Sequence, residues 1–108
     1  MQSTIQIKGL TYRDAAILSE KIQAAIVEGA KALILDMSAV AHMDSAGVGQ
    51  LVHGYSNAQA KGIPLVLVGA HCLVVETLRL MDLLQFLPLY DTVEQAQAGL
   101  LERSGTGD

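Results

Sequence analysis

The sequence Ala32-Leu33-Ile34-Leu35-Asp36-Met37-Ser38, with Asp44-Ser45-Ala46-Gly47-Val48-Gly49 shortly after it, decides the fold of this chain. The first four residues form a continuous apolar run, which is typical of a strand covered on both faces, as in a parallel sheet. A loop over residues 39–44 then leads to a helix that should begin around Ser45. A buried strand therefore delivers the chain directly to the first turn of a helix.

The alternation of strand and helix continues on both sides of this stretch. Period-two patterning predicts a strand over Thr4–Lys8, and a capping box predicts a helix that starts near Tyr12 and stops at Gly29. The later elements are expected to be a strand at 64–69, a helix at 71–81, a short edge strand at 87–90 and a helix from the Thr92–Gln95 capping box to about Glu102. The residues expected to face the core from the helices are Ala15, Leu18, Ile22, Ala25, Ile26, Val48, Leu51, Val52, Tyr55, Val74, Val75 and Leu78.

Strands that alternate with helices imply an α/β fold with a small, mostly parallel β-sheet and helices packed on it. Because the predicted strands are few, one face of the sheet is expected to be less covered than in a doubly wound enzyme. We expect a single domain over residues 1–103, followed by a flexible tail over residues 104–108.

The composition excludes several classes of protein. The chain has 108 residues, 51% of them hydrophobic, and a net charge of −4. An acidic chain without a basic stripe is a poor candidate for binding nucleic acid or an anionic membrane surface. The single cysteine, Cys72, excludes an intrachain disulfide, and neither a signal peptide nor a membrane span is recognisable. We therefore expect a cytoplasmic protein without membrane insertion; the composition neither demands nor forbids a homodimer.

Ser45 is the residue best placed for chemistry. It is expected at a helix N-terminus, where unpaired N–H groups and a partial positive charge favour an anion or a phosphate. Gly47 and Gly49 lower helix propensity by about 1 kcal/mol each relative to Ala, so close approach of another molecule is one reason for them. The alternative is purely structural: Asp44 or Ser45 serves only as the N-cap, and the glycines fit a tight junction.

Other kinds of site find little support. The nucleophile elbow G-x-S-x-G is absent because Met43 stands at the first glycine position, and neighbours such as Asp44 and Ser45 rarely converge as a triad. Gly47-Val48-Gly49 is too short for a nucleotide-binding loop. We therefore expect no enzyme, no cofactor and no metal site. The potential metal ligands lack ligand spacing and are expected to be surface or packed side chains: His42, His53, His71 and Cys72.

These residues resemble the STAS domain, the fold of bacterial anti-sigma factor antagonists and of sulfate-transporter tails. The central signature of that family is similar to Leu33–Val40 followed by Met43–Leu51. Lys61–Val68 and Tyr90–Ala96 are similar to its next strand and to the start of its last helix. The resemblance covers roughly residues 4–101, and the Asp-Ser-Ala-Gly segment is its most specific part.

The resemblance implies a function and a set of site residues. It implies an anti-sigma factor antagonist that binds an anti-sigma factor serine kinase and is released when that kinase phosphorylates Ser45. A serine phosphatase resets the switch. Partner-binding residues are expected at Asp44, Ala46, Gly47 and Gly49. The alternative within the same family is a non-switching scaffold subunit of a lipid-transport or signalling complex.

The chain departs from the family pattern in two places. The family usually has another strand before the one predicted at Thr4–Lys8, so the sheet is expected to be one strand smaller or its first strand differently used. The family also often has an Asp soon after the glycine that ends this strand. Here Gly9-Leu10-Thr11-Tyr12 has none.

Overall fold

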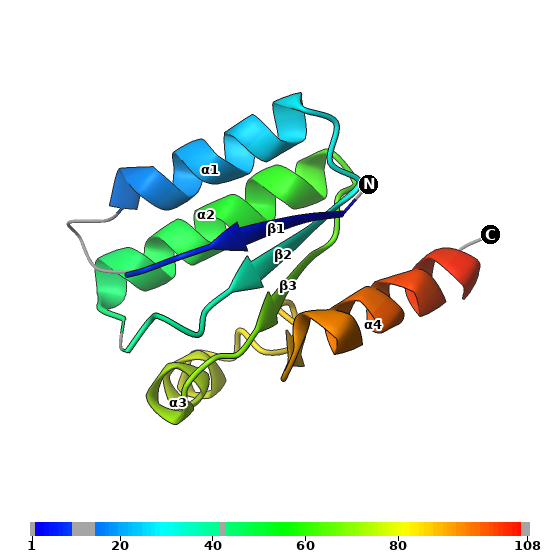
Figure 1. The fold of residues 1–108 in the computed structure, drawn as a ribbon. Helices are drawn as coiled ribbons and strands as arrows, with labels where there is room; N and C mark the ends of the chain where they lie inside the picture. The colour runs from blue at the N-terminus through cyan, green and yellow to red at the C-terminus, as the bar shows by residue number, and fades with distance from the viewer. Residues whose placement is uncertain (1, 10–14, 42, 107–108) are drawn as a thin grey trace.

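The computed structural model describes residues 2–9, 15–41 and 43–106 as a three-layer α/β structure (Figure 1). Helices α1, α2 and α3 contribute to the core on one face of the sheet, and α4 alone covers the other face. The predicted fold class is thus confirmed. The elements in chain order are β1 (Gln2–Gln6), α1 (Ala15–Val27), β2 (Ala32–Asp36), α2 (Ser45–Ala60), β3 (Leu65–Val68), α3 (Cys72–Leu80), β4 (Leu89–Tyr90) and α4 (Val93–Thr106).

The sheet places its strands in the order β1-β2-β3-β4, and each neighbouring pair is parallel. Parallel neighbours need a crossover between them, and α1, α2 and α3 supply the three crossovers. The carboxyl ends of all four strands therefore lie along the same edge. The loop that follows β2 leaves the sheet at this edge and leads to α2.

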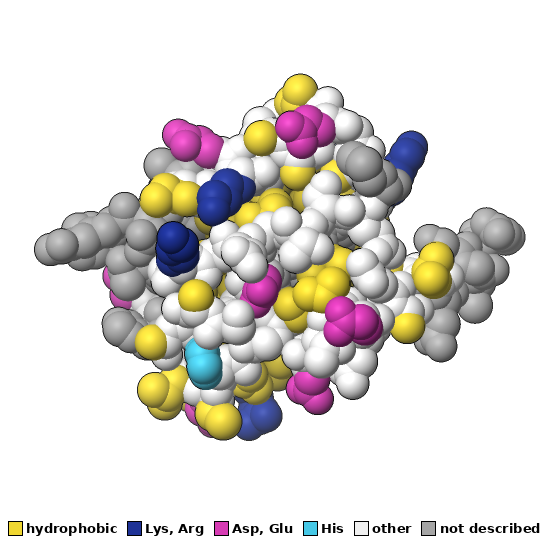
Figure 2. Space-filling view, in the orientation of Figure 1, with side chains coloured by type: hydrophobic (Ala, Val, Ile, Leu, Met, Phe, Trp, Pro, Cys, Tyr) yellow, Lys and Arg dark blue, Asp and Glu magenta, His cyan; other side chains and the backbone are white. Residues whose placement is uncertain are grey.

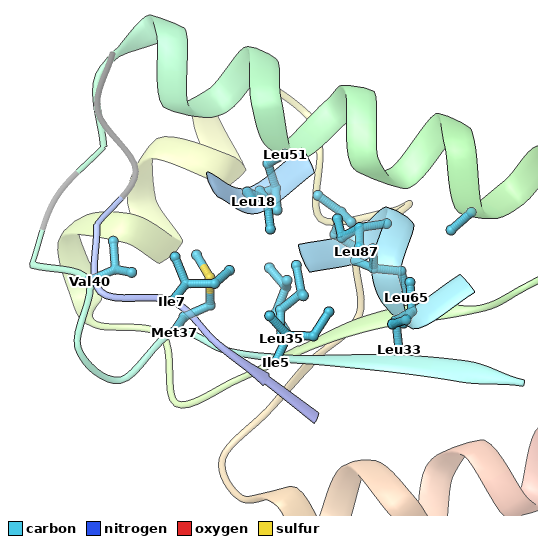
Figure 3. Packing of buried hydrophobic residues seen from close by; sticks show 14 of the residues in the cluster. Ile5, Ile7, Leu18, Leu33, Leu35, Met37, Val40, Leu51, Leu65 and Leu87 are labelled. Atoms are coloured by element: carbon cyan, nitrogen blue, oxygen red, sulfur yellow. The ribbon is translucent and has the colours of Figure 1, made fainter. Parts of the chain in front are cut away.

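The core lies on both faces of β2, as its unbroken apolar run predicts. Leu33 and Leu35 are fully buried in the cluster beneath α1, α2 and α3, whereas Ile34 is fully buried in the smaller cluster beneath α4. Figure 3 shows Leu18 of α1 and Leu51 of α2 above Ile5 and Leu35 of the sheet. Each large side chain buried in this way stabilises the fold by about 1.5–3 kcal/mol.

Strand β1 begins and ends two residues earlier than predicted. It covers Gln2–Gln6, and Ile5 pairs with Leu35 of β2. The alternation of side chains was predicted correctly, because Ile5 and Ile7 are both buried. Alternation, however, does not determine strand ends, which depend on the length of the neighbouring strand. Ile7 still donates its N–H to Asp36 O at 3.2 Å beyond the end of β1.

Helix α1 has the predicted buried face: Leu18, Ile22 and Ala25 are buried, and Ile26 packs against them. It ends at Val27, and the predicted stop residue Gly29, two positions later, adopts a left-handed conformation with φ of +92°. The Thr11–Asp14 capping box and the start near Tyr12 lie outside the described residues.

Helix α2 begins at Ser45, where the sequence predicts, but its buried face differs from the prediction at one residue. Val48 and Leu51 are buried and Tyr55 packs against the core, whereas Val52 is 37% exposed. The buried face also includes small residues that apolar patterning does not highlight: Gly47, Gly54 and Ala58. These residues occupy the inner side of the helix, so Val52 faces outward.

The last three elements also differ from the prediction in their bounds. Helix α3 and strand β4 are shorter than expected, and α4 continues to Thr106 instead of ending near Glu102. Residues 104–106 thus belong to the helix and not to the predicted tail. The Thr92–Gln95 capping box forms in part. The Gln95 N–H donates to Thr92 Oγ1 at 3.1 Å, but Gln95 Oε1 accepts from the N–H of Asp91, one residue before the expected donor.

Two glycines of α2, the exposed Gly49 and the buried Gly54, provide a test of this packing. A Cβ at Gly49 would meet open space, whereas a Cβ at Gly54 would lie 2.5 Å from Ile22 Cδ1 in the α1–α2 contact. We expect Gly49→Ala to raise the free energy of unfolding by up to about 1 kcal/mol through helix propensity. Gly54→Ala should be less stable than Gly49→Ala by about 1–3 kcal/mol, because the core must shift. Urea denaturation of both variants measures the difference, and equal stabilities would contradict the described contact.

Candidate functional site

The candidate site lies where β2 passes into α2 at the carboxyl edge of the sheet. Two fully buried side chains, Met37 and Val40, anchor the connecting loop. The Met37 N–H also donates to Val68 O of β3 at 2.8 Å, and the Val40 N–H donates to Met37 O at 3.0 Å. The loop is therefore held to the sheet before it reaches the first residue of α2.

Asp44 is the N-cap of α2. Its backbone is extended, with φ of −99° and ψ of −179°, and its side-chain oxygen Oδ1 accepts the Gly47 N–H at 2.8 Å. Its carbonyl oxygen accepts the Val48 N–H at 3.0 Å, which is the first hydrogen bond of the helix. A carboxylate at this position satisfies an otherwise unpaired N–H and complements the helix dipole. The structural role that the sequence allowed for Asp44 is therefore present.

Ser45 is the first residue of α2, and its side chain is exposed. Within the part of the chain that the structure describes, its hydroxyl makes no hydrogen bond. The N-cap role belongs to Asp44, so the Ser45 hydroxyl is not required for capping. A group attached to this oxygen would lie beside the N–H groups of the first helical turn.

The other predicted partner-binding residues differ in how exposed they are. Ala46 is half-buried and Gly47 is buried, with its N–H taken by Asp44. Gly49 is exposed and lies one helical turn after Ser45, on the same outward side of α2. Among the predicted site residues, Ser45 and Gly49 are therefore the exposed ones, and Asp44 and Ala46 are half-buried.

A second set of contacts at this edge, among Asp36, Ser38 and His71, was not predicted from the sequence. Ser38 donates both its hydroxyl, at 2.6 Å, and its N–H, at 3.0 Å, to Asp36 Oδ1. Its carbonyl oxygen lies 2.6 Å from Nε2 of His71, the residue before α3. A short Asp-x-Ser turn after a strand indicates the first pair, whereas nothing in the sequence indicates that His71 reaches Ser38. This junction ties the end of β2 to the start of α3.

The Ser38 contacts lower the pKa of Asp36 below its ordinary value of 3.8. The hydroxyl of Ser38 contributes most, its N–H contributes next, and partial burial opposes both by favouring the neutral acid. A carboxyl whose pKa is lower in the folded chain stabilises the fold above its unfolded pKa. That contribution is lost as the pH falls through the folded pKa.

Residues 2–9, 15–41 and 43–106 contain neither a cluster of metal ligands nor a membrane-spanning helix. No group of three or more His, Cys, Asp or Glu side chains there could hold a metal ion. No helix in those ranges is long and apolar enough to cross a membrane. Cys72 and His53 are both exposed, whereas His42 lies outside the described residues. In Figure 2, the Lys and Arg side chains on the visible face are few and form no continuous patch.

Truncation of the Asp44 side chain should measurably lower the free energy of unfolding. Asp44→Ala should lower the free energy of unfolding by about 1 kcal/mol, because the Gly47 N–H loses its acceptor. Asp44→Asn keeps an acceptor oxygen and should lose only a few tenths of a kcal/mol. Urea denaturation at neutral pH measures both variants. An equal loss in the two variants would show that the charge, and not the hydrogen bond, is what stabilises the helix start.

Removal of the Ser38 hydroxyl should raise the pKa of the Asp36 carboxyl. In Ser38→Ala we expect the pKa of Asp36 to rise toward its ordinary value while staying below it, because the backbone N–H contact persists. The acid-side loss of stability starts at the unchanged unfolded pKa, so in this variant it should be smaller and complete at a higher pH than in the original chain. Carboxyl NMR titration reports the pKa, and Ser56→Ala, which removes an exposed hydroxyl far from Asp36, is the control. No difference between the two variants would contradict the assignment.

Comparison with known proteins agrees with this geometry. The family model of the STAS domain matches residues 7–96 of the chain. A sulfate transporter family protein from Wolinella succinogenes is 22% identical, with a TM-score of 0.80 over 94% of this chain and 88% of that one. An anti-sigma factor antagonist from Mycobacterium paratuberculosis is 22% identical, with a TM-score of 0.75 over 91% of this chain and 84% of that one.

A third similar structure is the phosphorylated form of the Bacillus cell fate determinant SpoIIAA. It is 20% identical, with a TM-score of 0.69 over 92% of this chain and 90% of that one. At these identities the structural likeness shows a shared fold. The family model, in contrast, spans both the strand–loop–helix stretch around Ser45 and most of the elements on either side of it. The chain therefore belongs to the STAS domain family, as its central motif indicates.

Proposed function

We propose that this chain is an anti-sigma factor antagonist that acts by partner switching and has no catalytic activity of its own. With Ser45 unmodified it binds an anti-sigma factor serine kinase. Phosphorylation of Ser45 by that kinase releases it, and a serine phosphatase restores the binding form. In this way it controls how much sigma factor is available.

The single observation that carries the proposal is the accessibility of Ser45. Its side chain is exposed at the first position of a 16-residue helix, and capping is performed by Asp44. A kinase can therefore reach the hydroxyl without unfolding the helix start. In the transfer, the Ser45 oxygen forms a bond to the γ-phosphorus of ATP and the β–γ bridging bond breaks, so that ADP leaves. The serine proton passes to a base of the kinase, and hydrolysis by the phosphatase later releases inorganic phosphate.

The charge change explains how such a modification would release a partner. A phosphoserine adds about −1.5 to −2 charges. The N–H groups of the first turn favour an anion at this position, so the helix itself tolerates the phosphate. A partner fitted to the neutral form would instead meet new charge next to the Asp44 carboxylate. Misplaced charge in an interface costs several kcal/mol, which changes a dissociation constant by orders of magnitude.

The outward surface beside Ser45 suits such a partner. Helix α2 contains no Asp, Glu, Lys or Arg over its whole length. Gly49, one turn away, leaves open space where a side chain would stand. In the unmodified state a partner therefore meets a neutral helix tip at which its backbone can come close. Membership of the STAS family supports the proposal, since anti-sigma factor antagonists occur among the similar structures.

Phosphate mapping and two substitutions at one residue test the proposal. The chain is incubated with the anti-sigma factor serine kinase of its own organism and ATP, and the phosphate is located by mass spectrometry. We expect label on Ser45, no label on Ser45→Ala, and binding of Ser45→Ala that no longer depends on ATP. Ser45→Asp should bind the kinase at least about tenfold more weakly than the original chain.

Gln97→Glu is the matched control for Ser45→Asp. Gln97 is exposed on α4, so this variant adds one negative charge on the other side of the sheet and should bind as the original chain does. Label on another residue that persists in Ser45→Ala would contradict the proposal. Stable co-purification with a membrane ATPase or a scaffold, unaffected by Ser45→Asp, would instead support the non-switching scaffold role.

A further inference from the structure

A charge-free surface extends from Ser45 along α2 to an apolar groove. The exposed residues Ser45, Gly49, Val52, Ser56 and Gln59 are separated by four, three, four and three positions, which places them on one face of the helix. An exposed helix face normally carries charged side chains, but this one carries none. Depletion of charge, together with apolar and aromatic side chains, is the compositional mark of the centre of a protein–protein interface.

The groove is built where the chain turns back after α3. Asp82 adopts a left-handed conformation with φ of 58°, and the Leu83 N–H then donates to Leu78 O at 2.9 Å. In the turn that follows, Leu87 is buried with 1% of its surface exposed, whereas Phe86 remains 48% exposed. The Phe86 ring leans over α2, with its centroid 6.0 Å from that of Tyr55.

Two cavities lie next to this ring pair. A cavity of about 270 Å³ is lined by Val52, Ser56, Leu83 and Phe86 among other residues. A neighbouring cavity of about 230 Å³ is lined by Ile63, Pro64 and Leu65 and shares Tyr55, Gln59 and Phe86 with the first. Each has room for an apolar side chain of another protein. Since Val52, Ser56 and Gln59 belong to the same helix face as Ser45, the groove continues the surface on which the switch residue lies.

We infer that the kinase that phosphorylates Ser45 docks a second time, with an apolar side chain in this groove. The inference rests on the proposed function, because it assigns the groove to the same partner. From Ser45 to Ser56 the helix rises by roughly 16 Å, a span that one face of a folded partner covers easily. The partner surface has to be apolar and uncharged opposite the groove, because an unpaired charge there would lose its water without compensation.

Substitutions far from the Ser45 hydroxyl separate docking from phosphoryl transfer. We expect Phe86→Ala and Val52→Glu each to weaken binding of the kinase by about tenfold or more, since central apolar anchors dominate interfaces. When the chain is the kinase's substrate, both variants should raise KM by the same factor by which they weaken binding. They should leave kcat unchanged, because the groove does not touch the transferred phosphoryl group. Gln59→Glu adds a charge beside both cavities with almost no change of shape, and should act in the same direction.

Matched controls lie on other surfaces of the chain. Val27→Glu changes the same residue type at a position that is 75% exposed, and Leu101→Ala removes an apolar side chain that is 68% exposed on α4. Both controls should bind the kinase as the original chain does. Thermal denaturation shows whether each variant is folded. If Val52→Glu is not folded, Gln59→Glu alone decides, since Gln59 is exposed.

The outcomes distinguish this inference from the proposed function. If the kinase labels Ser45 and all three groove variants bind as their controls do, the groove is not a docking site and the switch at Ser45 stands. If Ser45 is not labelled, the proposed function fails first. Light scattering at increasing concentration provides one more check. A dimer of the chain that Val52→Glu abolishes would assign the groove to a second copy and overturn the inference.

Discussion

Burial of β2 on both of its faces is the constraint on which the rest of the structure depends. Leu33, Ile34 and Leu35 are consecutive and have no exposed surface, although their side chains point alternately to opposite sides of the sheet. A strand whose two faces must both be buried needs one layer of helices above it and another below it. Helices α1, α2 and α3 form the first layer and α4 forms the second (Figure 1).

The position of Ser45 follows from this arrangement. Parallel strands with helical crossovers bring all carboxyl ends to one edge, so the loop after β2 must emerge there. Met37 and Val40 bury the loop on the sheet, and the Asp36–Ser38–His71 contacts join it to the start of α3. The first turn of α2 is therefore presented by a fixed support. Under the proposed function, such a support would let one added phosphate change how another protein fits without a change of fold.

Helix α2 has an inner side that packs against the core and an outer side whose composition packing does not explain. Its inner side carries Val48, Leu51 and the closely packed Gly54, which explain how it is held. Its outer side has no charge and, at Gly49, no side chain, and neither feature is needed for packing. A solvent-exposed face gains solubility from charge, so this composition is best explained by the molecules that approach it.

The sequence by itself determined the alternation of strands and helices, the start of α2 at Ser45, and the glycine that ends α1. Each depends on local chemistry: continuous apolar runs, an Asp that caps the next turn, and a residue that tolerates positive φ. It also placed Ser45 close to a helix start but left the N-cap open between Asp44 and Ser45, and the structure assigns that role to Asp44.

Only the tertiary structure decided which residues lie in contact across distant segments. It shifted β1 by two residues through its register with β2, turned Val52 outward, and placed a glycine, Gly54, against Ile22. It also brought His71 to Ser38 and Phe86 over Tyr55. These contacts join residues that are far apart along the chain. Hydrophobic periodicity reports only which side of an element is apolar, and not what that side meets.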